Sequence, residues 1–243
     1  MPKSNGLGTL FLLPNVLSEE GDHTVFLPAY VSQVVSRIDG LIAESEKGAR
    51  RFLRRFSFPS PKTFRDIPVA LLNEHTIQSN AEELMHPLLR GETWGLISDC
   101  GLPCLADPGA WLVKRLRERN VGIEVVSGPS AIIFALLLSG LPAQSFSFHG
   151  YLPKEELMLR KKIQALESRS KEEKATQLFI EAPYRTEKLL RFLLATLQET
   201  TELALCCDLT LPTQSIVCQK VAAWKKQPLP SLDKRPAVFL FYA

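Results

Sequence analysis

The chain has 243 residues, of which 45% are hydrophobic and 23% charged, and 29 basic against 26 acidic residues leave a net charge of +3. This composition excludes a disordered chain, and it lacks the concentrated positive charge that alone would indicate nucleic-acid binding, although it permits an RNA substrate. The longest apolar runs, at 131–138 and 9–13, are shorter than the ~20 residues that a bilayer requires, and the N-terminus lacks signal-peptide features, so we expect a cytoplasmic protein without membrane association.

Apolar runs alternate with helical patterns in the first part of the chain, which is typical of a parallel sheet built from βαβ units. Strands are predicted at 9–13, 40–43, 69–72, 93–98 and 123–126, and helices at 28–37, 47–56, 81–89, 109–119 and 130–139. The last of these helices is apolar on every face. We therefore expect it to lie inside the molecule, or against a second domain or a second copy of the chain.

The second part of the chain contains more strand and alternates less regularly. Strands are predicted at 145–150, 177–181, 202–207, 214–217 and 237–242, with helices at 154–174 and 183–194. This pattern favours a mixed sheet with helices packed on it. The sequence therefore predicts an α/β fold of two domains: residues 1–143 with a mainly parallel sheet, and residues 144–243 with a mixed sheet.

Two segments are unusually rich in charge. Arg50, Arg51, Arg54 and Arg55 share one helix face, where their mutual repulsion has to be offset by solvent or by phosphate groups. The segment 154–174 is rich in Glu, Lys and Arg, which favours a solvated helix or helical hairpin with exposed ion pairs. An RNA contact is the alternative interpretation of that segment.

Cysteines and histidines are scattered at irregular spacing. The odd number of cysteines does not suggest a disulfide framework, and neither residue type recurs at the spacing of zinc ligands. We therefore expect reduced thiols that fill apolar space, and no metal site.

The most informative segment is SDCGLPCLADPG at 98–109, which follows a predicted strand and precedes a helix. Its Gly and Pro residues fix unusual backbone angles, and Ser98, Asp99 and Asp107 offer polar groups at the carboxyl end of the strand, where open α/β sheets bind ligands. Asp107 and Pro108 fit the N-cap and first position of the following helix. The Ser-Asp-Cys-Gly half has no such structural explanation and predicts a ligand site.

Polar loops follow the other predicted strands of the first domain, and they contain Pro14, Glu44, His75 and Ser130 in turn. In a parallel sheet these loops meet along one edge and form a single cleft that suits a small polar ligand. The chain has no Gly-x-Gly-x-x-Gly, Gly-Lys-Ser, Gly-Lys-Thr or Gly-x-Ser-x-Gly sequence. The usual dinucleotide, P-loop and serine-hydrolase sites are therefore disfavoured.

Several motifs occur together in the order of a known family. They are Ala43-Glu44 before a helix, Asn73-Glu74-His75, the segment at 98–109, SGPSA at 127–131, SFHGYLP at 147–153 and FIEAPYR at 179–185. This combination resembles the tetrapyrrole methylase superfamily, and within it the S-adenosylmethionine-dependent branch that includes the ribosomal RNA ribose 2′-O-methyltransferases of the small subunit. The resemblance implies a homodimer of two-domain α/β chains that bind S-adenosylmethionine in a cleft between the domains.

The resemblance also implies which residues contact this methyl donor. By position they are Pro14, Ser98, Asp99, Gly101, Leu102, Pro103, Ser130 and Ala131, with Ile180, Glu181, Pro236 and Ala237 toward the adenine. Transfer to a ribose hydroxyl gains from a general base, for which the candidates are Glu44 first, because it stands at a strand end in a matched motif, and then His75, Glu74 and Glu181. Structural roles, next to a helix N-cap for Glu44 and as a loop hydrogen bond for His75, are the alternatives.

Two loops depart from the family pattern. LPNVLSEE at 13–20 stands where the ribose methyltransferases carry Pro-x-Pro-Ile-Gly-Asn, and AESEK at 43–47 stands where they carry Ala-Glu-Asp-Thr-Arg. Both loops are expected where the substrate enters. Three alternatives for the methyl acceptor therefore stay open. The acceptor is RNA, or it is a tetrapyrrole or another small molecule, or the chain binds the donor without transferring the methyl group.

Overall fold

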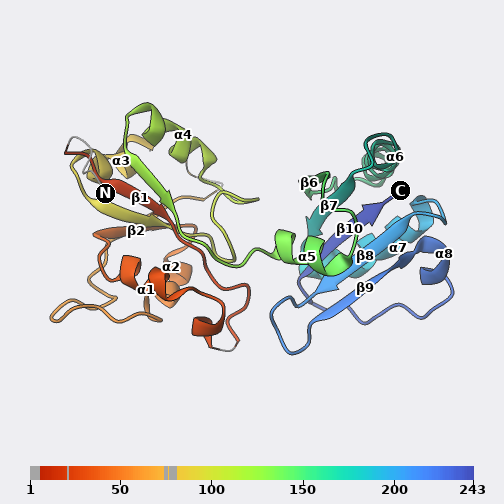
Figure 1. Cartoon of the computed structure of the whole chain (residues 1–243), viewed down its shortest axis with the longest axis horizontal. Coiled ribbons are helices and arrows are strands. Elements are labelled where there is room, and N and C mark those ends of the chain that lie inside the picture. The colour runs from red at the N-terminus through yellow and green to blue at the C-terminus, as the bar shows by residue number, and fades with distance from the viewer. Residues whose placement is uncertain (1–5, 21, 74–75, 77–80) are drawn as a thin grey trace. The chain divides into compact units, whose positions relative to one another are not determined.

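The computed structural model describes residues 6–20, 22–73, 76 and 81–243, and it divides the chain into two compact units, one up to Ser130 and one from Ala131 (Figure 1). The sequence predicts the boundary later, at 143/144. The difference lies in helix α5 (Ala131–Ser139), which packs against strands β10, β8 and β9 of the second unit. Contacts therefore assign this helix to the second unit.

The first unit alternates strands and helices as predicted. Its elements are β1 (Thr9–Leu12), a 3-10 turn η1 (His23–Val25), α1 (Ala29–Val35), β2 (Gly40–Ala43), α2 (Glu46–Leu53), β3 (Val69–Leu71), α3 (Ala81–Leu89), β4 (Thr93–Leu96), α4 (Ala110–Glu118) and β5 (Gly122–Val125). All neighbouring strands pair in parallel, in the order β3-β2-β4-β1-β5. The predicted parallel sheet is confirmed.

Both faces of this first sheet are covered. Phe11 and Leu41 belong to a buried cluster with α1 and α2, whereas Leu10 and Ile42 belong to another with α3 and α4. Because alternate residues of one strand are buried on opposite faces, the strands read as continuous apolar runs. Because helices cover both faces of the sheet, a ligand site is expected at the loops that follow the carboxyl ends of the strands.

The second unit is built on a mixed sheet. Its elements after α5 are β6 (Phe146–Tyr151), α6 (Glu156–Glu173), β7 (Thr176–Glu181), a 3-10 turn η3 (Pro183–Arg185), α7 (Thr186–Thr196), β8 (Glu202–Cys207), β9 (Ser215–Lys220), α8 (Val221–Trp224) and β10 (Ala237–Tyr242). The strand order is β6-β7-β10-β8-β9, in which only the β6–β7 pair is parallel. The charged segment forms one helix, α6, and not a hairpin. The predicted mixed sheet is confirmed.

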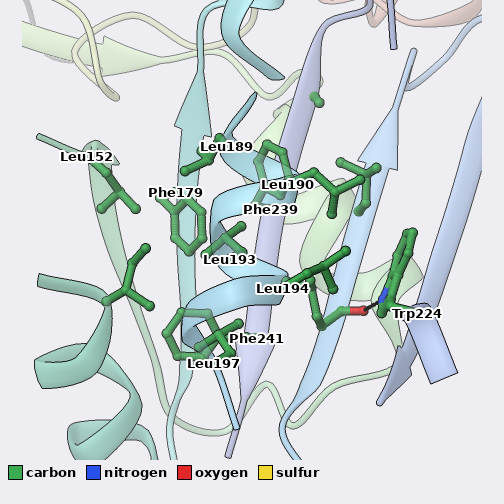
Figure 2. Close-up of a cluster of buried hydrophobic side chains, with 14 of the residues drawn as sticks. Leu152, Phe179, Leu189, Leu190, Leu193, Leu194, Leu197, Trp224, Phe239 and Phe241 are labelled. Carbon is green, nitrogen blue, oxygen red and sulfur yellow. Dashed lines mark hydrogen bonds between the residues drawn. The ribbon is translucent and has the colours of Figure 1, made fainter. Parts of the chain in front are cut away.

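The core of the second unit lies between its sheet and helices α6, α7 and α8 (Figure 2). Phe179 of β7 and Phe239 of β10 stack with ring centroids 5.7 Å apart, under the leucines of α7. Trp224 of α8 is buried, and its Nε1–H donates a hydrogen bond to the Leu203 carbonyl at 2.9 Å. This core fixes the carboxyl ends of β6 and β7 next to the starts of α6 and α7.

Helix α5 is buried on one side only. Ile132 and Ala135 are buried, whereas Leu137 is 67% exposed and Leu138 45% exposed within this single chain. Of the expected alternatives, packing against a second domain is therefore confirmed for one face of the helix, whereas the opposite face is exposed in the single chain. Among the described residues, no helix combines the length and apolar composition needed to cross a bilayer.

The five cysteines are free thiols in different environments. Cys206 and Cys207 are buried on β8, and burial raises their pKa to about 12 and about 11. Filling of apolar space is therefore confirmed for these two, while Cys100 and Cys218 are exposed.

Candidate active site

Asn15 joins the loop after β1 to the loop after β4. Its buried side-chain Nδ2 donates to the carbonyls of Ser98 at 3.0 Å and Asp99 at 3.1 Å, and its backbone N–H donates to the Gly101 carbonyl at 2.8 Å. The sequence predicts Pro14 as a site residue but not Asn15. The sequence does carry a signal for Asn15, because it is a polar residue directly after an apolar strand, at the edge of the sheet where ligands bind.

The loop after β2 also holds the loop after β4. The Glu44 Oε1 accepts a hydrogen bond from the Asp99 backbone N–H at 3.0 Å, and the Ser45 hydroxyl, which caps α2, lies 3.3 Å from the Asp99 Oδ1. The side-chain Nδ2 of Asn73, which follows β3, lies 3.5 Å from the carbonyl oxygen of Glu44. Glu74 and His75, two of the other candidate bases, lie outside the described residues.

The loop after β5 is packed tightly against the loop after β1. A Cβ placed on Gly128 would stand 2.0 Å from the Pro14 Cβ, so only glycine fits. A Cβ placed on Gly101 would stand 3.5 Å from the Pro129 carbonyl oxygen. The buried Ser130 ends this loop. The carboxyl edge of the first sheet thus assembles Pro14, Ser98, Asp99 and Gly101 with Glu44, as the sequence predicts.

The backbone of the loop after β4 is irregular. Its positive φ angles are 74° at Gly101, 65° at Cys104, 73° at Ala106 and 134° at Gly109. Two of these residues are not glycine, and such conformations cluster at functional sites. Gly109 is the N-cap residue of α4, so the predicted cap at Asp107 is wrong. The helix begins later than the Asp-Pro pair suggests, and the Asp107 carboxylate remains within the loop.

Three carboxylates gather at this edge: Glu44, Asp99 and Asp107. Burial raises the pKa of Glu44, and the charges of Asp107 and Asp99 raise it further, against the hydrogen bond from the Asp99 N–H. Burial also raises the pKa of Asp107, and the Asp99 charge adds to the rise. Within the part of the chain that the structure describes, none of the three forms an ion pair with Lys or Arg. The edge is therefore electrostatically suited to a cation.

The second group of predicted residues lies in the second unit. Glu181 of β7 pairs with Ala237 of β10, and Ile180 and Pro236 are their chain neighbours. The Glu181 side chain is buried, with its Oε1 2.8 Å from the Ala182 N–H and its Oε2 3.3 Å from the Arg185 guanidinium. Among the described residues, Oε2 receives no hydrogen bond. An acceptor is thus left over at the carboxyl end of β7.

The other residues predicted to contact the donor lie next to those already described. Leu102 and Pro103 continue the loop after Gly101, and Ala131 opens α5. The structure therefore collects the predicted contacts into two groups, one in each unit.

The arginine-rich face of α2 is stabilised by the protein itself. Arg51 and Arg55 both form ion pairs with Glu19, and Arg50 forms one with Glu46 at 2.8 Å. Arg50 also donates to the Ile67 carbonyl at 2.8 Å. The repulsion that the sequence reveals is therefore offset by protein carboxylates and carbonyls.

Comparison with known proteins gives a consistent assignment. The pattern of the family described as Tetrapyrrole (Corrin/Porphyrin) Methylases matches residues 30–223. "Ribosomal RNA small subunit methyltransferase I" of Vibrio cholerae is 32% identical over 212 residues, 87% of this chain and 68% of that protein. The protein of that name from Halalkalibacterium halodurans is 31% identical over 205 residues, 84% of this chain and 65% of that protein. The chain thus spans about two thirds of the length of these relatives.

The fold agrees with this assignment. The crystal structure of the methyltransferase CobJ has a TM-score of 0.61 at 13% identity, covering 98% of this chain and 94% of that one. S-adenosylmethionine, the donor of this methylase family, carries a sulfonium and an ammonium group, and the unpaired carboxylates at the carboxyl edge fit these cations. Sequence, fold and site therefore agree that the chain belongs to the tetrapyrrole methylase family of S-adenosylmethionine-dependent methyltransferases.

Proposed function

We propose that this chain transfers a methyl group from S-adenosylmethionine to RNA, in the manner of ribose 2′-O-methylation of ribosomal RNA. The proposal for the donor rests on the acidic carboxyl edge of the first sheet. There, Glu44, Asp99 and Asp107 have no basic ion-pair partner among the described residues. The names of the relatives support an RNA acceptor.

The donor contacts that we propose follow the two groups described above. In the first unit they are Pro14, Ser98, Asp99, Gly101, Leu102, Pro103 and Ser130; in the second unit they are Ala131, Ile180, Glu181, Pro236 and Ala237. We assign to Asp99 the orientation of the donor as a hydrogen-bond acceptor, beside the Ser45 hydroxyl that lies 3.3 Å from its Oδ1. The Oε2 of Glu181 lies 3.3 Å from the Arg185 guanidinium but receives no hydrogen bond among the described residues, so it offers an acceptor for the amino group of the adenine.

The chemistry asked of the protein is modest. The bound donor supplies a methyl group that its sulfonium has already activated. The loops at the carboxyl edge align the acceptor with this methyl group and exclude water. Glu44 accepts the proton of the acceptor hydroxyl, and its raised pKa places it closer to neutrality than an ordinary carboxyl. We propose Glu44 as the general base on this ground.

We further propose that the chain acts as a cytoplasmic homodimer. Leu137 and Leu138 of α5 present apolar side chains to solvent within one chain. A second copy that covered them would remove this apolar surface from water.

The acceptor is tested by mass spectrometry of small-subunit ribosomal RNA from cells with and without the gene. We expect one ribose methyl group to disappear with the gene and to return when the gene is supplied on a plasmid. An empty plasmid provides the control. Identical modification profiles in all strains would exclude this RNA as the acceptor and favour a tetrapyrrole or another small molecule.

A further inference from the structure

Helix α6, whose place in the fold is labelled in Figure 1, carries exposed basic side chains along its middle. We call the exposed residues Arg160, Lys161, Lys162, Arg169 and Lys171 the α6 basic face. Between residues 157 and 171 the only acidic residue is Glu167, which is buried. Its carboxylate accepts hydrogen bonds from the Gln198 N–H and the Thr201 hydroxyl. All exposed charges in this stretch are therefore positive.

Few of these charges are neutralised by neighbours. Among the described residues, Arg169 is the member of the α6 basic face that forms an ion pair, with Glu173 at 2.9 Å. Lys161 and Lys162 stand in the centre of the stretch without an acidic partner in the described part of the chain. The sequence favours a helix with exposed ion pairs. In α6 such ion pairs are limited to the two ends, where the acidic residues lie.

The positive potential extends to the edge strand β6. The Nε2 of His149 lies 2.8 Å from the Oε1 of Gln177, whose own amide nitrogen donates to the Ala175 carbonyl. Gln177 therefore offers only its oxygen, and the His149 Nε2 is the donor. Burial lowers the pKa of His149, and the charges of Lys162 and Arg169 lower it further, against this hydrogen bond. Both charged side chains that act on His149 from α6 are basic.

We infer that the α6 basic face binds the sugar-phosphate backbone of the RNA substrate, an inference that rests on the proposed function. From residue 160 to residue 171 the helix rises about 17 Å, which is long enough to meet several phosphates. The charges occupy the outward surface and both flanks of the helix. Such a distribution suits a polyanion that passes along the helix.

An anionic membrane is a poorer match for this face. A helix that lies on a membrane needs a continuous apolar stripe beside its basic residues. On α6 the exposed large apolar side chains, Leu157 and Met158, are confined to the first turn. The other leucines and the isoleucine of α6, Leu159, Leu166 and Ile163, are buried in the core of the second unit.

The test uses the full chain and the double variant Lys161→Gln/Lys162→Gln. Filter binding with transcribed small-subunit ribosomal RNA is measured across a range of salt concentrations. We expect the variant to bind about fivefold more weakly or worse, with a salt slope smaller by about 1.4, since each phosphate contact on a single strand contributes about 0.7. The matched control is Lys114→Gln/Arg117→Gln on α4, which removes the same charge from exposed positions.

The outcomes separate this inference from the proposed function. Equal weakening in the variant and the control, or none in either, would overturn the inference while RNA methylation by the wild-type chain still supported the function. Wild-type protein that neither binds nor methylates RNA would overturn both. Binding to phosphatidylserine vesicles in place of RNA would assign the face to a membrane and contradict the inference. Unchanged affinity of the variant for S-adenosylmethionine shows that it is folded.

Discussion

Glu44→Gln is expected to slow methyl transfer about 10²- to 10⁴-fold, the usual contribution of a general base, while lowering the affinity for S-adenosylmethionine far less, because Asp99 and Asp107 keep their charges. The two effects separate because Glu44 has two roles. Its Oε1 holds the Asp99 N–H at 3.0 Å, and a glutamine oxygen can replace it there. A glutamine cannot accept the proton of the acceptor hydroxyl. Single-turnover rates and calorimetric titration measure the two properties independently.

The pH dependence of the methyl-transfer rate is a second test of the same variant. The base must be ionised, so the rate of the wild-type chain rises as the pH increases through the Glu44 pKa. Burial and the charges of Asp107 and Asp99 raise that pKa above its ordinary value. We therefore expect the rate of the wild type to fall at acid pH with a midpoint above the ordinary pKa of a glutamate, and this fall to be absent in Glu44→Gln.

Glu46→Gln is the matched control for this change. Glu46 lies two residues further along, and its exposed ion pair with Arg50 contributes little to stability. We expect a wild-type rate for this control. Full activity in Glu44→Gln would refute the role of Glu44 as the base, and a large loss of donor affinity would show that it only positions the loop after β4.

Gly128→Ala is expected to disrupt the site from a position that carries no functional group. The new Cβ would stand 2.0 Å from the Pro14 Cβ, and the proline ring cannot turn aside. The loop after β5 must therefore move away from the loop after β1. We expect the affinity for S-adenosylmethionine to fall about tenfold or more and the free energy of unfolding to fall by about 1–3 kcal/mol, the usual cost of overpacking. Calorimetry and urea denaturation measure the two changes.

Gly140→Ala supplies the control for Gly128→Ala. Gly140 has a φ of +70°, and no atom lies within 4 Å of a Cβ placed there. A side chain in this conformation costs about 1–2 kcal/mol through backbone strain alone. We expect this control to lose stability and keep its donor affinity. Normal donor binding by Gly128→Ala would show that the packing of Pro14 on Gly128 is unrelated to the site.

The parts of the fold that the sequence predicts are those with a local signal. Strands such as β2 are buried on both faces, so their apolar runs stand out, and the polar loops after them mark the carboxyl edge. Helix α8 has only four residues, which is too short for a periodic pattern. Asp107-Pro108 has the sequence of a helix start and so predicts the wrong cap for α4, whose N-cap residue is Gly109.

The interactions that the sequence does not reveal join residues far apart in the chain. Asn15 contacts Ser98, which is 83 residues away, and nothing local to Asn15 indicates that partner. The charges of Arg51 and Arg55 are visible in the sequence, but their neutralisation by Glu19 depends on how the loop after β1 folds back. In α6, the burial of Glu167 turns a mixed charge pattern into a basic surface. Each of these partners is set by the tertiary fold.

Titration of the wild-type chain with S-adenosylmethionine in a calorimeter tests the central claim most directly. The claim is that the carboxyl edge of the first sheet belongs to a methyl-donor site. We predict saturable binding of one donor per chain, weakened about tenfold or more in Gly128→Ala and weakened far less in Glu44→Gln. The absence of any heat of binding for either S-adenosylmethionine or S-adenosylhomocysteine with folded wild-type protein would contradict the claim.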